Sequence, residues 1–210
     1  MTQHVFSRVA GFQLIIIPRA PFRIKLGDVD SHSIDVAYES PGGQLLATVI
    51  PDAGGYRSEL GENTGSLFDV LDVERGPETA EWRIETSLFS CCWPQGYALC
   101  SNNFPNDPGP FDLIGPNREM IYVQHPKTLP DVADMCGPGQ SIVGIERGAN
   151  AEWIDLQYEH DSRLWHQRHV VVRKTDGRIA VTMQAPVAFA EVAMAATDAV
   201  VRSLKPYPTI

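Results

Sequence analysis

Apolar and polar residues alternate along three stretches near the carboxyl end of the chain. The stretches are 153–158, 164–174 and 179–186. A period of two is typical of strands that bury one face. Polar residues at 159–163 separate the first pair of stretches, and Asp176-Gly177, a typical type I′ turn, separates the second pair. The pattern therefore predicts an antiparallel β-meander.

Helical spacing replaces this alternation after Pro186. Apolar residues then recur every three or four positions, at Phe189, Val192, Ala193, Ala196, Val200 and Leu204. This spacing predicts an amphipathic helix over 187–204 that packs on the meander. We expect Phe189 to be buried, so that Phe189→Ala would cost about 3–5 kcal/mol of folding stability.

The amino-terminal part is predicted to be rich in strands. Apolar or alternating runs predict strands at 12–17, 22–26, 33–38 and 45–50, and Pro41-Gly42-Gly43 joins the last two as a hairpin. Glycines and charges at 51–64 predict an exposed loop, and the type of element at 67–73 is left open. Turn residues near 75–80 predict a boundary between a β-rich subdomain, 1–80, and a second domain, 81–210. One continuous domain is the alternative.

Prolines and glycines interrupt the middle of the chain. Strands are predicted at 82–90, 98–100, 120–124 and 141–145. Between them, residues 101–117 contain Pro105, Pro108, Gly109, Pro110, Gly115 and Pro116, which exclude a long helix or a central strand. A long loop inside a compact domain is often functional, so the region 101–124 is a candidate for binding.

Charge and composition narrow the class of protein. The chain has 17 Lys and Arg against 26 Asp and Glu, a formal net charge of −9, with no basic stripe. Nucleic acid is therefore not expected as a partner, since binding to it depends on basic contacts with phosphate. The longest apolar run, 14–17, is too short for a membrane span. The amino terminus lacks signal-peptide features, which predicts a cytoplasmic protein.

Candidate chemistry is sparse. Cys91, Cys92, Cys100 and Cys136 lack C-x-x-C spacing and are predicted to be free thiols, while His166 and His169 should face opposite sides of one strand, away from His160. Ser141 lacks the surroundings of a nucleophile, and no phosphate-binding loop occurs. Carboxylates such as Asp131 with Asp134, Asp155 with Glu159, or Asp69 and Asp72 leave a hydrolase open as the alternative. We predict no catalytic residue, metal or cofactor.

Aromatic residues around the long loop form the best candidate for a binding surface. They are Trp93, Tyr97, Phe104, Phe111 and Tyr122. Such a set suits a groove for a peptide or an apolar ligand. The alternative is that these side chains form core beneath the loop.

The segment 82–206 resembles the PsbP/DcrB-like α-β-α sandwich family. The resemblance rests on Trp93-Pro94-Gln95-Gly96-Tyr97, the strand from Gly148 to Tyr158 with its Trp153, the aromatic strand with Trp165-His166-Gln167-Arg168, the Gly177 hairpin, Gln184-Ala185-Pro186 and a helix ending Val201-Arg202-Ser203-Leu204. Tyr97 stands where the family has tryptophan. The resemblance implies a non-enzymatic, protein-binding role, and it carries over no binding residue.

These observations predict an α+β fold: a mainly antiparallel sheet with a C-terminal helix packed on it, similar to an α-β-α sandwich. The predicted function is a non-catalytic adaptor or chaperone of a bacterial-type cell. It would hold a partner protein or peptide on a sheet face or on the 101–124 region. A homodimer is an alternative for the oligomeric state.

Overall fold

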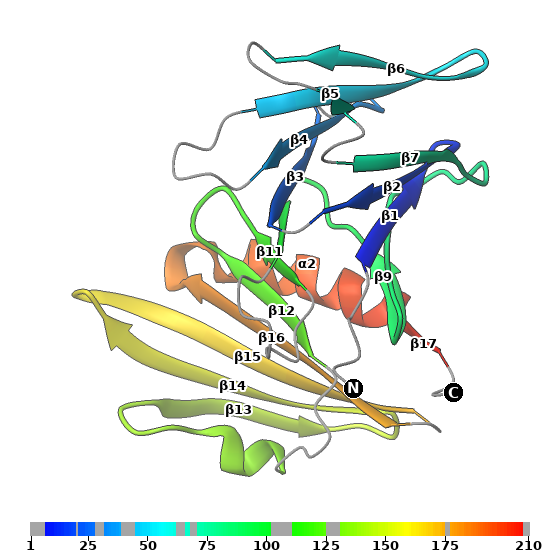
Figure 1. Cartoon of the computed structure of the whole chain (residues 1–210). Coiled ribbons are helices and arrows are strands. Elements are labelled where there is room, and N and C mark those ends of the chain that lie inside the picture. The colour runs from blue at the N-terminus through cyan, green and yellow to red at the C-terminus, as the bar shows by residue number, and fades with distance from the viewer. Residues whose placement is uncertain are drawn as a thin grey trace.

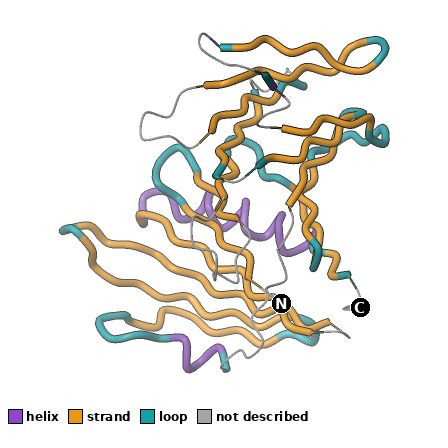
Figure 2. Tube along the Cα trace, viewed as in Figure 1, coloured by secondary structure: helices purple, strands orange, loops and turns teal. Residues whose placement is uncertain are grey.

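The computed structural model describes residues 7–19, 21–27, 32–38, 45–61, 66–67, 71–101, 111–124, 131–174 and 177–207. Their backbone forms two antiparallel sheets and a helix, α2 (Ala190–Ser203) (Figures 1 and 2). Two short 3₁₀ turns, η1 (Val132–Met135) and η2 (Val187–Phe189), accompany them.

The longer sheet has 11 strands. In sheet order they are β13 (Ser141–Arg147), β14 (Ala151–His160), β15 (Arg163–Lys174), β16 (Gly177–Pro186), β12 (Met120–Gln124), β11 (Phe111–Ile114), β10 (Ala98–Ser101), β3 (Phe22–Leu26), β4 (Ile34–Tyr38), β5 (Leu45–Asp52) and β6 (Gly55–Leu60). The edge strands are therefore β13 and β6. Figure 1 shows them at opposite ends of the molecule.

The shorter sheet has six strands and covers part of one face of the longer sheet. In order they are β17 (Lys205–Pro206), β9 (Phe89–Cys92), β8 (Arg83–Thr86), β1 (Ser7–Gly11), β2 (Leu14–Pro18) and β7 (Leu71–Arg75). Phe89 of this sheet meets Phe111 of the other, with 6.1 Å between ring centroids. Apolar side chains of both sheets and of α2 merge into one core.

The predicted meander is confirmed, and so is the helix that closes it. β14, β15 and β16 pair antiparallel along nearly their whole length, and α2 packs mainly on β16. Asp176 lies outside the described residues, although Lys174 and Gly177 pair on either side of it. Local pattern sufficed here because each strand pairs with its neighbour in sequence.

The predicted α+β, α-β-α sandwich-like class is wrong. The molecule is mostly antiparallel β-sheet. An α-β-α sandwich would have helices on both faces of its sheet, whereas here the six-stranded sheet packs on part of one face. The error arose because strand pattern shows that a segment is extended, but not which sheet it joins.

The predicted apolar stripe of the helix is correct at Ala193, Val200 and Leu204, which are buried, and wrong at Phe189 and Val192. Phe189 is 38% exposed and Val192 63% exposed, whereas Ala190, Ala193, Thr197 and Val200 are buried. The small alanines let α2 approach the sheet closely, and the Thr197 hydroxyl is satisfied by donating to the carbonyl of Ala193 at 2.7 Å. Thr197 therefore occupies a core position, although the spacing of apolar residues alone would not place a threonine there.

Several other segments differ from expectation. Residues 51–64 include strand β6, which turns back from β5, and 82–90 contains most of the hairpin of β8 and β9 in place of one strand. β11 lies inside the segment predicted to be irregular. Pairing of β1 with β8 and of β3 with β10 carries hydrogen-bonded sheet across the predicted boundary near residue 80.

Candidate functional site

The predicted aromatic set does not form one exposed groove among the described residues. Trp93, Tyr97 and Phe111 are core side chains, and Phe104 lies outside the described residues. Tyr122 is half-buried and pairs with Asp112, so it projects from the sheet face opposite to that of the neighbouring Phe111. Burial of Tyr122, with the charge of Asp112 and the phenol of Tyr158, raises its pKa to about 12.

The two strand histidines lie on opposite faces of β15, as predicted. His169 bonds to the Thr182 hydroxyl at 2.9 Å and to the Gln167 amide at 2.8 Å, and its burial lowers its pKa. His166 Nε2 lies 2.9 Å from a carboxylate oxygen of Asp155 on the other face. Within the described ranges, no three His, Cys, Asp or Glu residues are grouped so as to hold a metal ion.

Asp155 organises a polar cluster between β14, β15 and the helix. Arg168 donates two hydrogen bonds to its carboxylate, at 2.7 and 2.8 Å, and also lies 3.8 Å from Asp198 of α2. Burial opposes ionisation of Asp155, but the hydrogen bonds from His166 and Arg168 outweigh it and lower its pKa to about 2. A carboxylate held ionised in this way is a structural anion, poorly suited to act as an acid or base near neutral pH.

Two other carboxylates that were candidates for a hydrolase also form ion pairs with arginine. Asp131 accepts a hydrogen bond from the Ala133 amide at the start of η1, and it pairs with Arg147 at 3.1 Å. Asp72 pairs with Arg19 at 3.2 Å across β2 and β7. Both carboxylates are thus held in ion pairs with arginine, and Asp69 lies outside the described residues.

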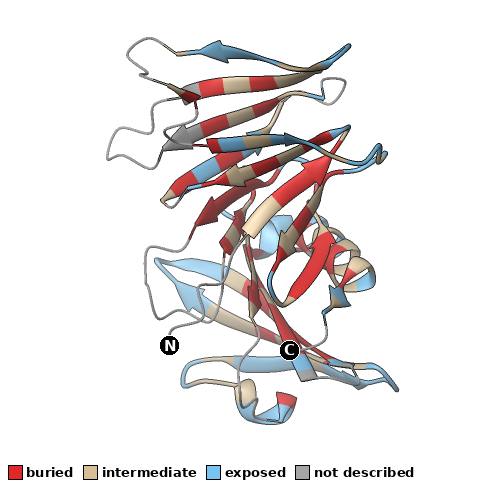
Figure 3. Ribbon diagram, turned by 45° about the vertical axis from the view of Figure 1, so that its right-hand side comes forward, coloured by how far each residue is buried: buried red, intermediate tan, exposed pale blue. Residues whose placement is uncertain are grey.

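Strand β13 is an edge strand that exposes apolar side chains. It is the first strand of the 11-stranded sheet, and among the described strands none pairs with its outer edge. Ile142, Val143 and Ile145 are 48%, 51% and 42% exposed, although strand apolar side chains usually pack. Figure 3 shows most of this strand in the colour of exposed residues. An open edge carries unpaired backbone N–H and C=O groups, which act as a template for another strand.

A β-bulge at Val143 gathers the apolar side chains of this edge. Ile142 pairs with Leu156, and Ile145 pairs with Ile154 on the same face of β14. Residues three apart in a regular strand point to opposite faces, so the extra residue at the bulge is what brings both isoleucines to one face. That face continues into the small core beneath η1, which contains Val132.

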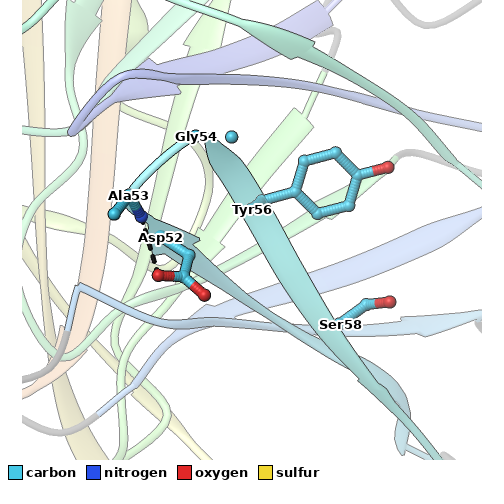
Figure 4. A pocket seen from close by; sticks show the side chains of 6 residues that line it. Asp52, Ala53, Gly54, Tyr56 and Ser58 are labelled. Carbon is cyan, nitrogen blue, oxygen red and sulfur yellow. Dashed lines mark hydrogen bonds between the residues drawn. The ribbon is translucent and has the colours of Figure 1, made fainter.

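The opposite edge strand, β6, has a different character. Its residues alternate Tyr56, Arg57, Ser58, Glu59 and Leu60, so charges break up the apolar positions. A hollow of about 590 Å³ lies at the turn from β5 to β6 (Figure 4). The Asp52 carboxylate there accepts a hydrogen bond from the Ala53 amide at 2.7 Å, so one of its oxygens is already bonded within the turn.

The sequence predicted a strand at β13 but not its place in the sheet. Apolar residues at 142, 143 and 145 were the signal for an extended segment. Their exposure follows from the sheet order, which no local pattern contains.

Comparisons with known proteins add little. No protein-family model and no curated protein matches the chain. Among solved structures, LpqN, described as involved in cell envelope biogenesis of Mycobacterium tuberculosis, is similar over 98% of this chain and 93% of its own, with 10% identity and a TM-score of 0.28. A likeness of that size supports no argument. In the described part of the chain, no helix has the length and apolar character needed to cross a membrane. The PsbP/DcrB-like resemblance stays a prediction.

Proposed function

We propose that this protein is a non-catalytic, adaptor-like or chaperone-like module that holds an extended segment of a partner protein along β13. The observation that carries the proposal is the open edge of β13 with its three exposed apolar side chains. The resemblance of 82–206 to a family of protein-binding modules points the same way, and both it and the expected cytoplasmic location belong to the proposal.

Strand addition explains why an exposed edge would keep apolar side chains. A segment laid against β13 would bond its main chain to the free N–H and C=O groups, while its side chains would meet Ile142 and Ile145. Main-chain bonds supply affinity with little regard to sequence, and the apolar side chains select the segment.

A different protein fits this edge better than a second copy. The bulge at Val143 interrupts the even spacing that two long strands need, and such bulges are a common guard against self-pairing. Each copy has a formal net charge of −9, so two copies repel each other.

The charged residues at the end of β13 indicate which charge the partner segment should carry. Arg147 is already paired with Asp131 at 3.1 Å and lies 3.7 Å from Glu152. Glu146 beside it has no ion pair with any residue that the structure describes. We therefore expect an apolar segment with a basic residue near the position opposite Glu146.

The test compares two edges of the same sheet. The Ile142→Lys, Ile145→Lys double variant places charges on the exposed face of β13, and Leu60→Lys makes the same kind of change on β6, where Leu60 is 48% exposed. Partners are captured from native extract on each full-length protein and identified by mass spectrometry. We expect one protein recovered by wild type and Leu60→Lys but lost from the double variant.

Hydrogen exchange then locates the contact. With the recovered partner bound, amides of 141–147 should gain protection that the amides of β6 do not. Equal recovery on all three proteins, or protection elsewhere, would refute the proposal. If wild type is instead a dimer by light scattering and the double variant a monomer, the occupant is a second copy and the partner assignment fails.

A further inference from the structure

A cavity of about 630 Å³ lies away from β13, where the turn between β1 and β2, the end of the β8–β9 hairpin and the last turn of α2 meet. Its walls include three aromatic residues, Phe12, Trp82 and Trp93, and its charged lining residues include Arg202. Its volume lies within the range of small-molecule sites. We infer that this cavity binds a small, flat, apolar molecule carrying one anionic group.

The turn that supplies Phe12 is held in a conformation its residues do not favour. Phe12 and Gln13 have φ of 47° and 69°, a left-handed region that costs energy for side chains of their kind. Their amides donate to the carbonyls of Thr79 and Pro77 at 3.3 and 3.2 Å, which fixes the turn. The Phe12 ring consequently lies 3.9 Å from the His32 ring and 5.8 Å from the Trp82 ring, measured between centroids. Such strain is found repeatedly at ligand clamps.

The two tryptophans line the cavity with only a small part of each side chain, since each residue is 5% exposed. Gly11 lies so close to Trp82 that an added Cβ would stand 2.8 Å from the indole carbons, so only glycine permits this approach. Trp93 donates its backbone amide to the Trp82 carbonyl at 3.0 Å and its indole N–H to the Tyr97 carbonyl at 2.9 Å. Both side chains are thus held in place, and the more open rings of the cavity are those of Phe12 and His32, against which a flat apolar ligand would lie.

Charge completes the description of the ligand. Arg202 lies in the last turn of α2 and makes no ion pair with another described residue. An unpaired guanidinium at the rim of an apolar cavity suits a carboxylate or sulfonate. Glu81 also lines the cavity, which disfavours a ligand with a second negative charge.

The probe for this site is 8-anilinonaphthalene-1-sulfonate, which combines flat rings with one sulfonate. We expect one molecule to bind per full-length chain, with increased dye emission and quenched emission of Trp82 and Trp93. Ala199→Phe fills the cavity from α2, and we expect it to weaken binding more than about tenfold because the probe loses its space. Ala195→Phe, on the exposed side of the same helix, is the matched control and should leave affinity unchanged.

A charge variant tests the anion and leaves the core intact. Arg202→Gln should weaken binding of the sulfonate about fivefold, the size of a partly exposed ion pair. It should not affect the uncharged analogue N-phenyl-1-naphthylamine, and Arg178→Gln, at an exposed arginine of β16, should change neither. Equal affinity of wild type, Ala199→Phe and Arg202→Gln for the sulfonate would overturn the inference, as would an Arg202 effect of equal size on both dyes. If Ala199→Phe does not fold, the two dyes on Arg202→Gln still decide the question.

Discussion

Replacing Asp155 by asparagine should destabilise the protein in a way that depends on pH. The Asp155 carboxylate is 13% exposed and is held by Arg168 and His166, so its ionised form is favoured in the folded state and its pKa falls from 3.8 to about 2. This difference corresponds to about 2.5 kcal/mol of stability at neutral pH. Asparagine fills the same space but loses the charge that both partners need.

The sign of the pH dependence follows from the lowered pKa. The contribution is complete above the unfolded value of 3.8 and is lost as the pH falls through the folded value of about 2. Linkage gives about 1.3 kcal/mol remaining at pH 3. Urea unfolding of wild type and Asp155→Asn at pH 7, 5, 4 and 3 measures the difference directly.

The control is Asp72→Asn, which breaks an ion pair between two side chains that are about half exposed. Its cost should stay below about 1 kcal/mol. A difference between wild type and Asp155→Asn that stays constant from pH 7 to pH 3 would refute the role assigned to this carboxylate.

Two further predictions concern packing. Val200→Ala should cost about 1.5–3 kcal/mol in urea unfolding because Val200 is fully buried, while Val192→Ala on the exposed side of the same helix should cost less than about 0.5 kcal/mol. Equal or reversed costs would contradict this facing of α2. Gly11→Ala should cost about 1–3 kcal/mol because its Cβ would stand 2.8 Å from Trp82, whereas a Cβ at Gly54 meets nothing within 4 Å. The same unfolding measurement on Gly54→Ala is the control, and a Gly11→Ala protein as stable as wild type would contradict the close packing.

The sequence carried enough information for the elements whose partners are adjacent in the chain. The alternation from 153 to 186 and the later helical spacing predicted β14, β15, β16 and α2. It failed at part of the buried face of α2, because Thr197 occupies a core position through a hydrogen bond to its own helix that hydropathy does not register, while Val192 is exposed. It also placed Phe12 in a strand, since phenylalanine and glutamine are not residues expected in a turn of positive φ.

The candidate sites depended more on tertiary structure than the elements did. Trp93 belonged to the predicted aromatic set and does line a cavity, but its companions there, Phe12 and Trp82, are distant in sequence and were not part of that set. Strand β13 was predicted as a strand like any other.

Local pattern by itself therefore determined that this chain is rich in antiparallel strands, carries one helix after the meander and has an excess of acidic over basic residues. These properties follow from neighbouring residues, from hydrophobic period and from charge count. Only the tertiary structure decided that the strands form two sheets, that β13 is an open edge and that the aromatic cavity exists. The physical reason is that edges and cavities are created by pairings between distant segments, and an extended segment has the same pattern whichever neighbour it meets.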